Sequence, residues 1–337
     1  MMPAMETTTP RPLRPEPNRR LSVAPMMNHT DRHFRTLLRL ISRHVMLYTE
    51  MITTGALLYG PAERRLAHAA AEHPLGLQLG GSDPEALARC AQLAEATGFN
   101  EVNLNVGCPS DRVQEARFGA CLMAEPNLVA ECIAAMAGAV TIPVTVKTRI
   151  GVDERDRYED LAGFIATVNA AGCNTFVIHA RKAWLKGLSP RENRQRPPLQ
   201  YATVYQLKRD FPGLEIILNG GVTSLDEVAT HLQHVDGVMI GRAACSNPCL
   251  LQDADRRLFG DPTTSRRRQD VLRHYVDYAA EQVAAGTNVH HVARHTIGLF
   301  QGLPGARAFR RHLAEQSCRP GAGVSCLREA MELVAAA

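Results

Sequence analysis

One cysteine lies in a setting that could present its thiol to a ligand. Cys108 follows the strand-like run EVNLNVG (101–107) and stands between Gly107 and Pro109. Glycine allows unusual backbone angles and proline ends a strand, so the thiol is expected at the strand end. A free thiol is mostly protonated at neutral pH and can act as a general acid or, beside a base, as a nucleophile. The nearby sequence offers no orienting histidine, so a proton donor is at least as well supported as a nucleophile.

Other apolar runs also end in polar side chains, namely Gln78 in LGLQLGG, Lys147 in PVTVKTR and His179 in NTFVIHA. Lys147 indicates an anionic ligand or a developing negative charge, unless it only reaches for solvent. His179 fits a hydrogen-bonded structural role as well as a ligand contact. Gln78 could bond a polar ring edge or satisfy the backbone. Each signal is weak alone, but their recurrence at successive strand ends predicts a site.

Two glycine-containing turns follow the last two strand-like runs, in ILNGGV and VMIGRA. The residues concerned are Asn219, Gly220, Gly221, Gly241 and Arg242. Glycines let backbone N–H groups approach an anion, and an arginine adds a fork of donors for phosphate oxygens. Both sequences are also compatible with simple tight turns. Their position after the last two strands favours phosphate binding, without identifying the phosphorylated ligand.

The elements that would position these groups alternate along the chain. Eight strand-like runs cover 21–26, 45–51, 75–81, 101–107, 143–149, 174–180, 215–221 and 236–242. Helical periodicity fills gaps between them, at 31–41, 83–98, 127–138, 161–172 and 225–233. Eight such units predict an α/β fold, a parallel (β/α)8 TIM barrel, whose C-terminal strand ends carry the site. A doubly wound open sheet is the alternative, although no GxGxxG follows the first strand.

The two ends of the chain differ from the middle. Residues 1–20 are rich in Pro, Thr and Arg and predict a disordered leader. Residues 21–260 form the predicted barrel, and residues 262–337 predict a helical domain. The helical end has 10 Lys and Arg against 6 Asp and Glu, which accounts for the whole formal charge of +4. A second basic cluster spans 181–196. Such clusters suit a phosphate backbone, although solvated charged faces are more common.

Composition excludes several classes of protein. Nine cysteines without a CxxC, and no apolar segment at the start, argue against a disulfide-rich secreted protein and favour the cytoplasm. No run approaches the roughly 18 apolar residues of a membrane span. The CxxxC of Cys245 and Cys249 lacks partner ligands at suitable spacing, so no metal site is predicted.

Taken together, these motifs resemble the tRNA-dihydrouridine synthase family. The similarity runs through LSVAPMMNHTDRHFR, LQLGG, NLNVGCPSDRVQEARFGACLM, VKTRIG, HARKAWLKGLSPRENR, ILNGGV, IGRAA and RHTIGLFQGLPGARAFRR, over about residues 20–320, and is closest to the A-type subfamily. The resemblance implies an FMN enzyme that uses NADPH to reduce the C5–C6 double bond of uridines 20 and 20a in the D-loop of tRNA. No protein partner is evident from the sequence.

The resemblance also implies roles for individual residues. Cys108 would protonate C5, and Asn105 would contact the uracil. The FMN-binding residues would be Pro25, Met26, Met27, Gln78, Lys147, His179, Asn219, Gly220, Gly221, Gly241 and Arg242. The tRNA contacts would include Arg191, Arg194, Arg307 and Arg310. A flavin reductase of small pyrimidines and a tRNA-binding protein without required catalysis remain the alternatives.

Overall fold

The computed structural model describes residues 16–263 and 265–335. Its eight strands are all parallel: β1 (Leu21–Val23), β2 (Leu47–Thr53), β3 (Leu75–Gly80), β4 (Glu101–Val106), β5 (Val144–Arg149), β6 (Thr175–His179), β7 (Glu215–Asn219) and β8 (Gly237–Ile240). β1 pairs with β8, and a bridge between Ser22 and Met46 joins β1 to the segment before β2. Val23 N–H donates to Met46 O at 2.9 Å across this joint. The sheet therefore closes, which confirms the predicted barrel over the open sheet.

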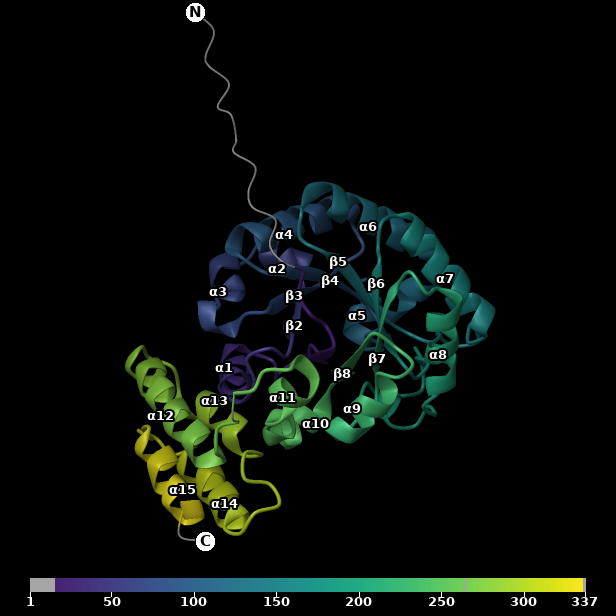
Figure 1. Ribbon diagram of the computed structural model, residues 1–337. Coiled ribbons are helices and arrows are strands. Elements are labelled where there is room, and N and C mark those ends of the chain that lie inside the picture. The colour runs from purple at the N-terminus through teal and green to yellow at the C-terminus, as the bar shows by residue number, and fades with distance from the viewer. Residues whose placement is uncertain (1–15, 264, 336–337) are drawn as a thin grey trace, which may run out of the picture.

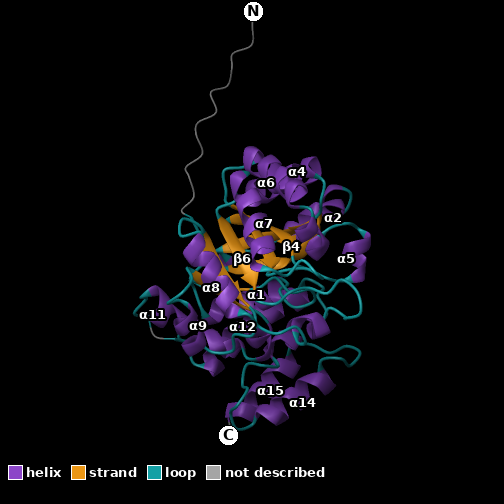
Figure 2. Cartoon of the chain, turned by 90° about the vertical axis from the view of Figure 1, so that its right-hand side faces the viewer, coloured by secondary structure: helices purple, strands orange, loops and turns teal. Residues whose placement is uncertain are grey.

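Helices form the outer layer of the barrel (Figures 1 and 2). They are α1 (Arg32–Ile41), α2 (Thr54–Leu58), α3 (Ala62–Leu66), α4 (Pro84–Thr97), α5 (Asp111–Glu115), α6 (Pro126–Ala139), α7 (Tyr158–Ala170), α8 (Tyr201–Asp210), α9 (Leu225–His231), α10 (Arg242–Ser246) and α11 (Ala254–Phe259). In α4, Asp83 caps the N-terminus by accepting from Ala86 N–H, Pro84 occupies the first turn, and Gly98 ends the helix with φ of 106°. These capping residues explain why the observed helix α4 agrees with the helix predicted over 83–98.

The C-terminal part is helical, as predicted. It contains α12 (Arg268–Ala284), α13 (Val289–Ala293), α14 (Ala306–Gln316) and α15 (Ser325–Ala335), which lie together beside α1 and α10 in Figure 1. Tyr275 of α12 is buried, and its hydroxyl donates to Val292 O at 3.0 Å. Tyr278 bonds His33 of α1 at 2.7 Å. Two tyrosines of α12, one buried and one half-buried, thus bond other elements, and Tyr278 ties α12 to α1 of the barrel.

Arg19 differs from the prediction of a disordered leader over 1–20. Residues 1–15 lie outside the described residues, but Arg19 is only 2% exposed. Its guanidinium donates to Glu101 at 2.6 Å and to Glu215 at 2.8 Å, where the lumen begins. A Cβ on Gly237 would lie 2.3 Å from Arg19 O, so the glycine admits this backbone. Arg19 therefore closes the barrel floor, by contacts with strands too distant in sequence to be foreseen.

The lumen has two unlike halves. One is an apolar cluster made mainly by β1, β2 and β6–β8: Ala24, Met46, Tyr48, Val177, Ile217 and Met239. On the other, Gln78 of β3, Asn103 of β4 and Thr145 of β5 are buried and lie side by side in register. We call these the apolar half and the polar half.

Among the described residues, no helix has the length and hydropathy needed to cross a membrane.

Candidate active site at the barrel mouth

The cysteine loop is held by hydrogen bonds to its own backbone. Asn105 Oδ1 accepts from the N–H groups of Gly107 at 3.1 Å and Cys108 at 2.9 Å. Cys108 O accepts from Ala120 N–H at 2.8 Å. A Cβ at Gly119, where φ is 79°, would lie 2.5 Å from Cys108 O, so this close approach requires glycine. The half-exposed thiol has Ser110 Oγ at 3.5 Å. The loop thus fixes Cys108 at the end of β4.

Arg149 ties the cysteine loop to the loop that follows β6. Its Nε donates to Gly107 O at 2.8 Å, and its Nη1 donates to Lys182 O and Asn193 O, both at 3.1 Å. Burial lowers the pKa of this arginine to about 10. The sequence interpretation did not select Arg149. A possible signal was its spacing of two from Lys147, which places both on one face of a strand.

Lys147 connects the two halves of the lumen. Its Nζ donates to Asn219 Oδ1 at 2.9 Å, and Asn219 Nδ2 donates to Met239 O at 2.7 Å. Burial, followed by repulsion from Arg149, lowers the pKa of Lys147 to about 7. Within the described part of the chain, no carboxylate forms an ion pair with it. An anion arriving at the mouth would therefore meet an uncompensated ammonium or readily protonated amine.

The turn after β7 requires glycine. Gly220 has φ of 119°, and a Cβ there would lie 2.7 Å from the His179 ring. Gly221 has φ of 75°, and its Cβ would lie 2.6 Å from Leu199. Burial and repulsion by Arg149 and Lys147 hold the pKa of His179 well below its ordinary value, so its ring is neutral. Tyr201 fixes the turn by donating to Gly220 O at 2.8 Å.

The turn after β8 is more open. A Cβ on Gly241 would have no neighbour closer than Ala24 and Met26 Sδ, both at 4.0 Å. Arg242 donates to Arg194 O at 3.0 Å, which brings together two arginines that were predicted separately, one for phosphate and one for tRNA. The turn after β8 thus leaves open space beside two basic side chains.

The segment after β1 places its methionines differently. Met26 is partly buried against the apolar half, with its Sδ 3.8 Å from Cys245 Sγ. Its N–H donates to Thr30 Oγ1 at 2.9 Å. Met27 is 54% exposed, whereas Pro25 is half-buried. Of the two methionines, Met26 is the one that packs against the lumen.

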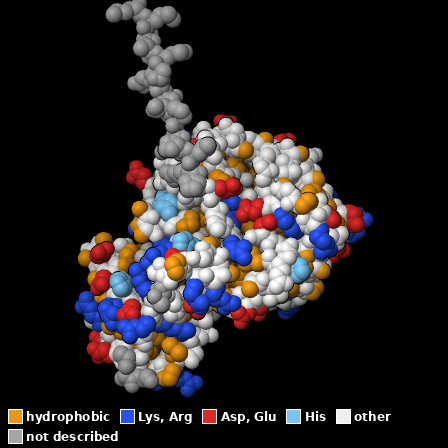
Figure 3. All heavy atoms as spheres, viewed as in Figure 1, with side chains coloured by type: hydrophobic (Ala, Val, Ile, Leu, Met, Phe, Trp, Pro, Cys, Tyr) orange, Lys and Arg blue, Asp and Glu red, His pale blue; other side chains and the backbone are white. Residues whose placement is uncertain are grey.

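A cavity of about 520 Å³ lies between the β1 loop, α10 and the C-terminal helices. It is lined by His29, Phe34, Cys245, Ser246, Arg294, His295, Ile297, Gly298, Gln301, Gly302 and Arg310. Of the two predicted arginines on α14, Arg310 lines this cavity and Arg307 does not. Figure 3 shows Lys and Arg side chains gathered over the lower part of this face, where the C-terminal helices lie.

Asp31 joins the start of α1 to the C-terminal helices, and the sequence interpretation missed it. Its Oδ1 accepts from the N–H groups of His33 and Phe34, both at 3.0 Å. Its Oδ2 accepts from Arg294 at 2.6 Å and His295 at 2.9 Å. Burial raises the pKa of Asp31, but hydrogen bonds from His295 and Arg294 outweigh it and hold the pKa below its usual range. Asp31 therefore caps the N-terminus of α1 and, as a charged carboxylate, bonds Arg294 and His295 in the wall of the cavity.

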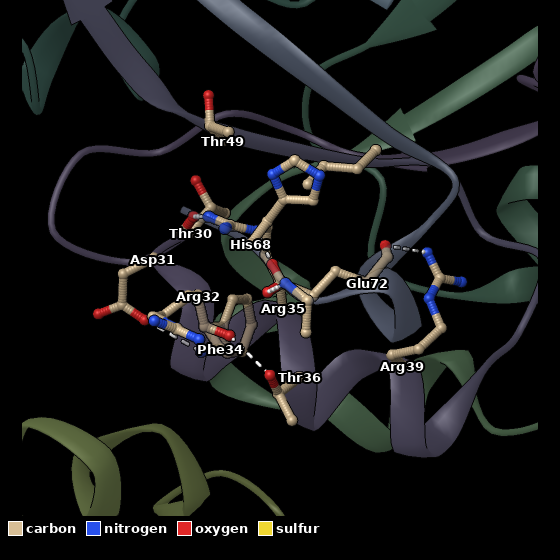
Figure 4. Close-up of polar contacts among 12 residues, drawn as sticks. Thr30, Asp31, Arg32, Phe34, Arg35, Thr36, Arg39, Thr49, His68 and Glu72 are labelled. Atoms are coloured by element: carbon tan, nitrogen blue, oxygen red, sulfur yellow. Dashed lines mark hydrogen bonds and ion pairs between the residues drawn. The ribbon is translucent and has the colours of Figure 1, made fainter. Parts of the chain in front are cut away.

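Arg35 anchors the same helix from its inner side. Figure 4 shows Arg35 reaching toward Thr30 and Glu72, while Asp31 points away from it. Arg35 donates to Thr30 O at 2.8 Å and to Glu72 at 2.7 Å. Asp31 and Arg35 thus connect the start of α1 to two other parts of the molecule.

One group of described residues has the spacing of a metal site: His44, Asp255 and Asp261. Asp255 already accepts from the Ser42 hydroxyl and from Arg43 N–H, and His44 bonds Asp261 at 2.9 Å. Through these contacts the three residues hold the loop before β2 against α11 and the segment that precedes α12. The group contains none of the residues of the barrel mouth.

The fold and the mouth define an α/β barrel with a candidate phosphate-binding edge beside a presented thiol. The family model described as Dihydrouridine synthase (Dus) matches residues 22–334. This chain therefore belongs to the dihydrouridine synthase family.

Curated relatives extend over nearly the whole chain. A protein of Shewanella oneidensis named tRNA-dihydrouridine(20/20a) synthase is 57% identical over 94% of this chain and 94% of its own length. Proteins with the same name from Vibrio cholerae and Escherichia coli K12 are each 56% identical, over 93% and 94% of this chain and 95% and 92% of their own lengths. A structure of 2-naphthoyl-CoA reductase with 2-naphthoyl-CoA is 13% identical, with a TM-score of 0.53 over 72% of this chain and 50% of that one. That likeness concerns the fold alone.

Proposed function

We propose that this protein reduces the C5–C6 double bond of uridine to dihydrouridine in the D-loop of tRNA, at positions 20 and 20a, with FMN as cofactor and NADPH as reductant. The observation that carries the proposal is the meeting of Cys108, Lys147 and the Gly220–Gly221 turn at one barrel mouth, in a member of this family. The relatives named above support tRNA as substrate and positions 20 and 20a as targets.

The chemistry of the residues present fits a flavin mononucleotide. A Cβ at Gly220 or Gly221 would fill the turn, and Arg242 stands beside the open turn at Gly241, so backbone N–H groups and a guanidinium would hold the phosphate. The ring would be held by Pro25, Met26, Met27, Gln78, Lys147 and His179. Bound FMN, once reduced, supplies the hydride that the reduction adds to C6 of uracil.

Cys108 would supply the proton at C5 from its thiol, since addition at C6 leaves negative charge that a proton must quench. The Cys108 sulfur interacts electrostatically with Lys147 and Arg149, which places both basic side chains near it. Asn105, held by the cysteine loop, would contact the uracil through its amide. To reach these groups the uridine must leave its stack.

The basic surface would hold the tRNA around that extruded base. Arg191 and Arg194 lie at the short 3-10 turn Glu192–Arg194 after β6, and Arg307 and Arg310 lie on α14. We assign tRNA binding to the C-terminal domain, residues 262–337, and catalysis to the barrel, residues 21–260. All nine cysteines are free, which suits action in a reducing cytoplasm.

The direct test supplies purified protein with FMN, NADPH and a tRNA transcript that lacks modifications. Mass spectrometry should find dihydrouridine at positions 20 and 20a, and a transcript with cytidine at both positions should stay unreduced. Failure of a flavin-loaded preparation to reduce the uridine-containing transcript would overturn the proposal.

A further inference from the structure

Three polar residues lie where a barrel lumen ordinarily holds branched apolar side chains. Gln78, Asn103 and Thr145 are 1%, 0% and 0% exposed, and the strand register places them side by side. Burying a polar group costs free energy unless it is hydrogen-bonded. Their partners should therefore reveal what these residues do.

The partners form one unbroken chain from the cysteine loop toward the floor. Cys108 N–H donates to Asn105 Oδ1 at 2.9 Å, and Asn105 Nδ2 donates to Gln78 Oε1 at 2.9 Å. Gln78 Nε2 then donates to Asn103 Oδ1 at 2.8 Å. Asn103 Nδ2 donates to Thr145 Oγ1 at 2.9 Å, and that hydroxyl donates to Glu101 Oε1 at 2.8 Å. We call this the lumen chain.

Both ends force the direction of the lumen chain. A backbone N–H, here that of Cys108, can only donate. Both carboxyl oxygens of Glu101 accept from other donors, Oε1 from the Tyr48 hydroxyl and Oε2 from Arg19 Nε, each at 2.6 Å. Each amide between them must therefore present its oxygen toward Cys108 and its nitrogen toward Glu101. Reversing one amide would set two acceptors or two donors against each other. The orientation of Asn105 is thus fixed by groups on three neighbouring strands.

We propose that Asn103 and Thr145 are positioning residues for Cys108. They act through Gln78 and Asn105, whose amide oxygen holds the N–H groups of the cysteine loop. Neither residue touches the substrate in this proposal. The expected effect on turnover rests on the proposed function, in which Cys108 is the proton donor. The claim that the lumen chain controls the position of the thiol is independent of that function.

The test removes one hydroxyl without changing volume. Thr145→Val cuts the lumen chain above Glu101, whereas Thr145→Ser keeps the hydroxyl and loses a methyl group. Thr175→Val is the matched control, because the Thr175 hydroxyl donates to Glu215 at 2.8 Å, on the floor but outside the lumen chain. The holoenzyme of each variant is assayed with tRNA, and alkylation of Cys108 by iodoacetamide is followed by peptide mass spectrometry. The exposed Cys318 serves as an internal reference.

Thr145→Val should lower kcat roughly ten- to a hundred-fold, because a small displacement of a reacting group is that costly, while KM for tRNA changes little. It should also change the rate of Cys108 alkylation relative to Cys318. Thr145→Ser should restore both, and Thr175→Val should alter neither. If Thr145→Val does not fold, Asn103→Ser breaks the same chain one residue higher and carries the same expectation.

Equal behaviour of Thr145→Val and Thr145→Ser, or an unchanged Cys108 alkylation rate in the variant that cuts the chain, would overturn the proposal. The alkylation measurement needs no turnover. A wild-type protein that fails to reduce tRNA would therefore refute the proposed function and still leave the lumen chain testable.

Discussion

The two halves of the lumen solve different problems with different residues. On the polar half, side chains of β3, β4 and β5 are fixed by hydrogen bonds, and Asn105 connects them to Cys108 N–H. On the apolar half, Val177, Ile217 and Met239 pack without directional bonds beneath the turns that follow β7 and β8. Hydrogen bonds fix the orientation of a group, whereas apolar packing fixes volume and leaves the backbone to make the contact. The polar half thus supports the Cys108 thiol, for which we propose a reacting role, and the apolar half supports the candidate phosphate cradle.

Lys147 connects the two halves of the lumen at the barrel mouth. It projects from β5 and bonds Asn219 of β7. Because both strands end at the same edge, one ammonium can respond to a ligand that touches both sides. Substitutions on either half should therefore have separable effects, and substitution of Lys147 should affect their coupling.

The largest expected effect comes from Cys108→Ala on the polar half. Loss of the proposed proton donor should lower turnover on tRNA by roughly 10²–10⁴-fold, while the flavin absorbance of the protein and its affinity for tRNA stay unchanged. Cys318→Ala is the control, since that thiol is exposed in the C-terminal part. Loss of bound flavin in Cys108→Ala would contradict the division of labour between the halves.

The next effect is expected from Gly220→Ala on the apolar half. The new Cβ would lie 2.7 Å from the His179 ring at φ of 119°, so the turn must shift and the affinity for FMN should fall. Gly172→Ala is the control for backbone strain without steric crowding. Gly172 also has a positive φ, of 105°, but a Cβ there would have no neighbour within 4 Å. Both variants should lose about 1–2 kcal/mol of stability from backbone strain. Only Gly220→Ala should lose flavin in an equilibrium titration, with Cys108 alkylation in the flavin-free protein unchanged.

Much of this architecture follows from local sequence. EVNLNVG, PVTVKTR and NTFVIHA predicted strands that the structure confirms within two residues, and Asp83, Pro84 and Gly98 mark the ends of α4. Glycines and prolines act on their own backbone, so Gly107 and Pro109 could indicate a presented thiol. The residues at strand ends could be selected for the same reason.

What could not be predicted depends on register and on distant partners. EVNLNV shows that Glu101, Asn103 and Asn105 share a face, but only the pairing of β3, β4 and β5 shows that Gln78 and Thr145 complete the lumen chain. Arg19 was read as part of a leader because its partners lie 82 and 196 residues away. Asp31 was missed for the same reason, since Arg294 is 263 residues distant.

A smaller effect should appear in the pH dependence of the flavin-free protein. The pKa of Lys147 is lowered from 10.5 to about 7, so between these values the unfolded chain binds the additional proton. The free energy of unfolding should therefore rise with pH across that window, owing to this group. Lys147→Met should remove that part of the rise in urea denaturation, and the exposed Lys186→Met should keep it.

The groups around Lys147 sharpen that prediction. Arg149 repels its charge, and His179 stays neutral in this range, so neither reverses the sign. Bound FMN should reduce the slope, because an anionic ligand favours the protonated lysine in the folded state. A slope unaffected both by Lys147→Met and by FMN would show that Lys147 does not couple the two halves.

The smallest effect is expected outside both halves, at Arg310 on α14. This exposed side chain lines the cavity beside the β1 loop, and we propose that it contacts a tRNA phosphate. Arg310→Ala should weaken tRNA binding and reduce the slope of log affinity against log salt by about 1, because one fewer counterion is released. The exposed Arg328 of α15, which does not line this cavity, should leave the slope unchanged when replaced by Ala. Flavin content and Cys108 alkylation should be the same in both variants. If Arg310→Ala lowered flavin content instead, the cavity would belong to the cofactor cradle of the apolar half, and the basic surface would need a different function.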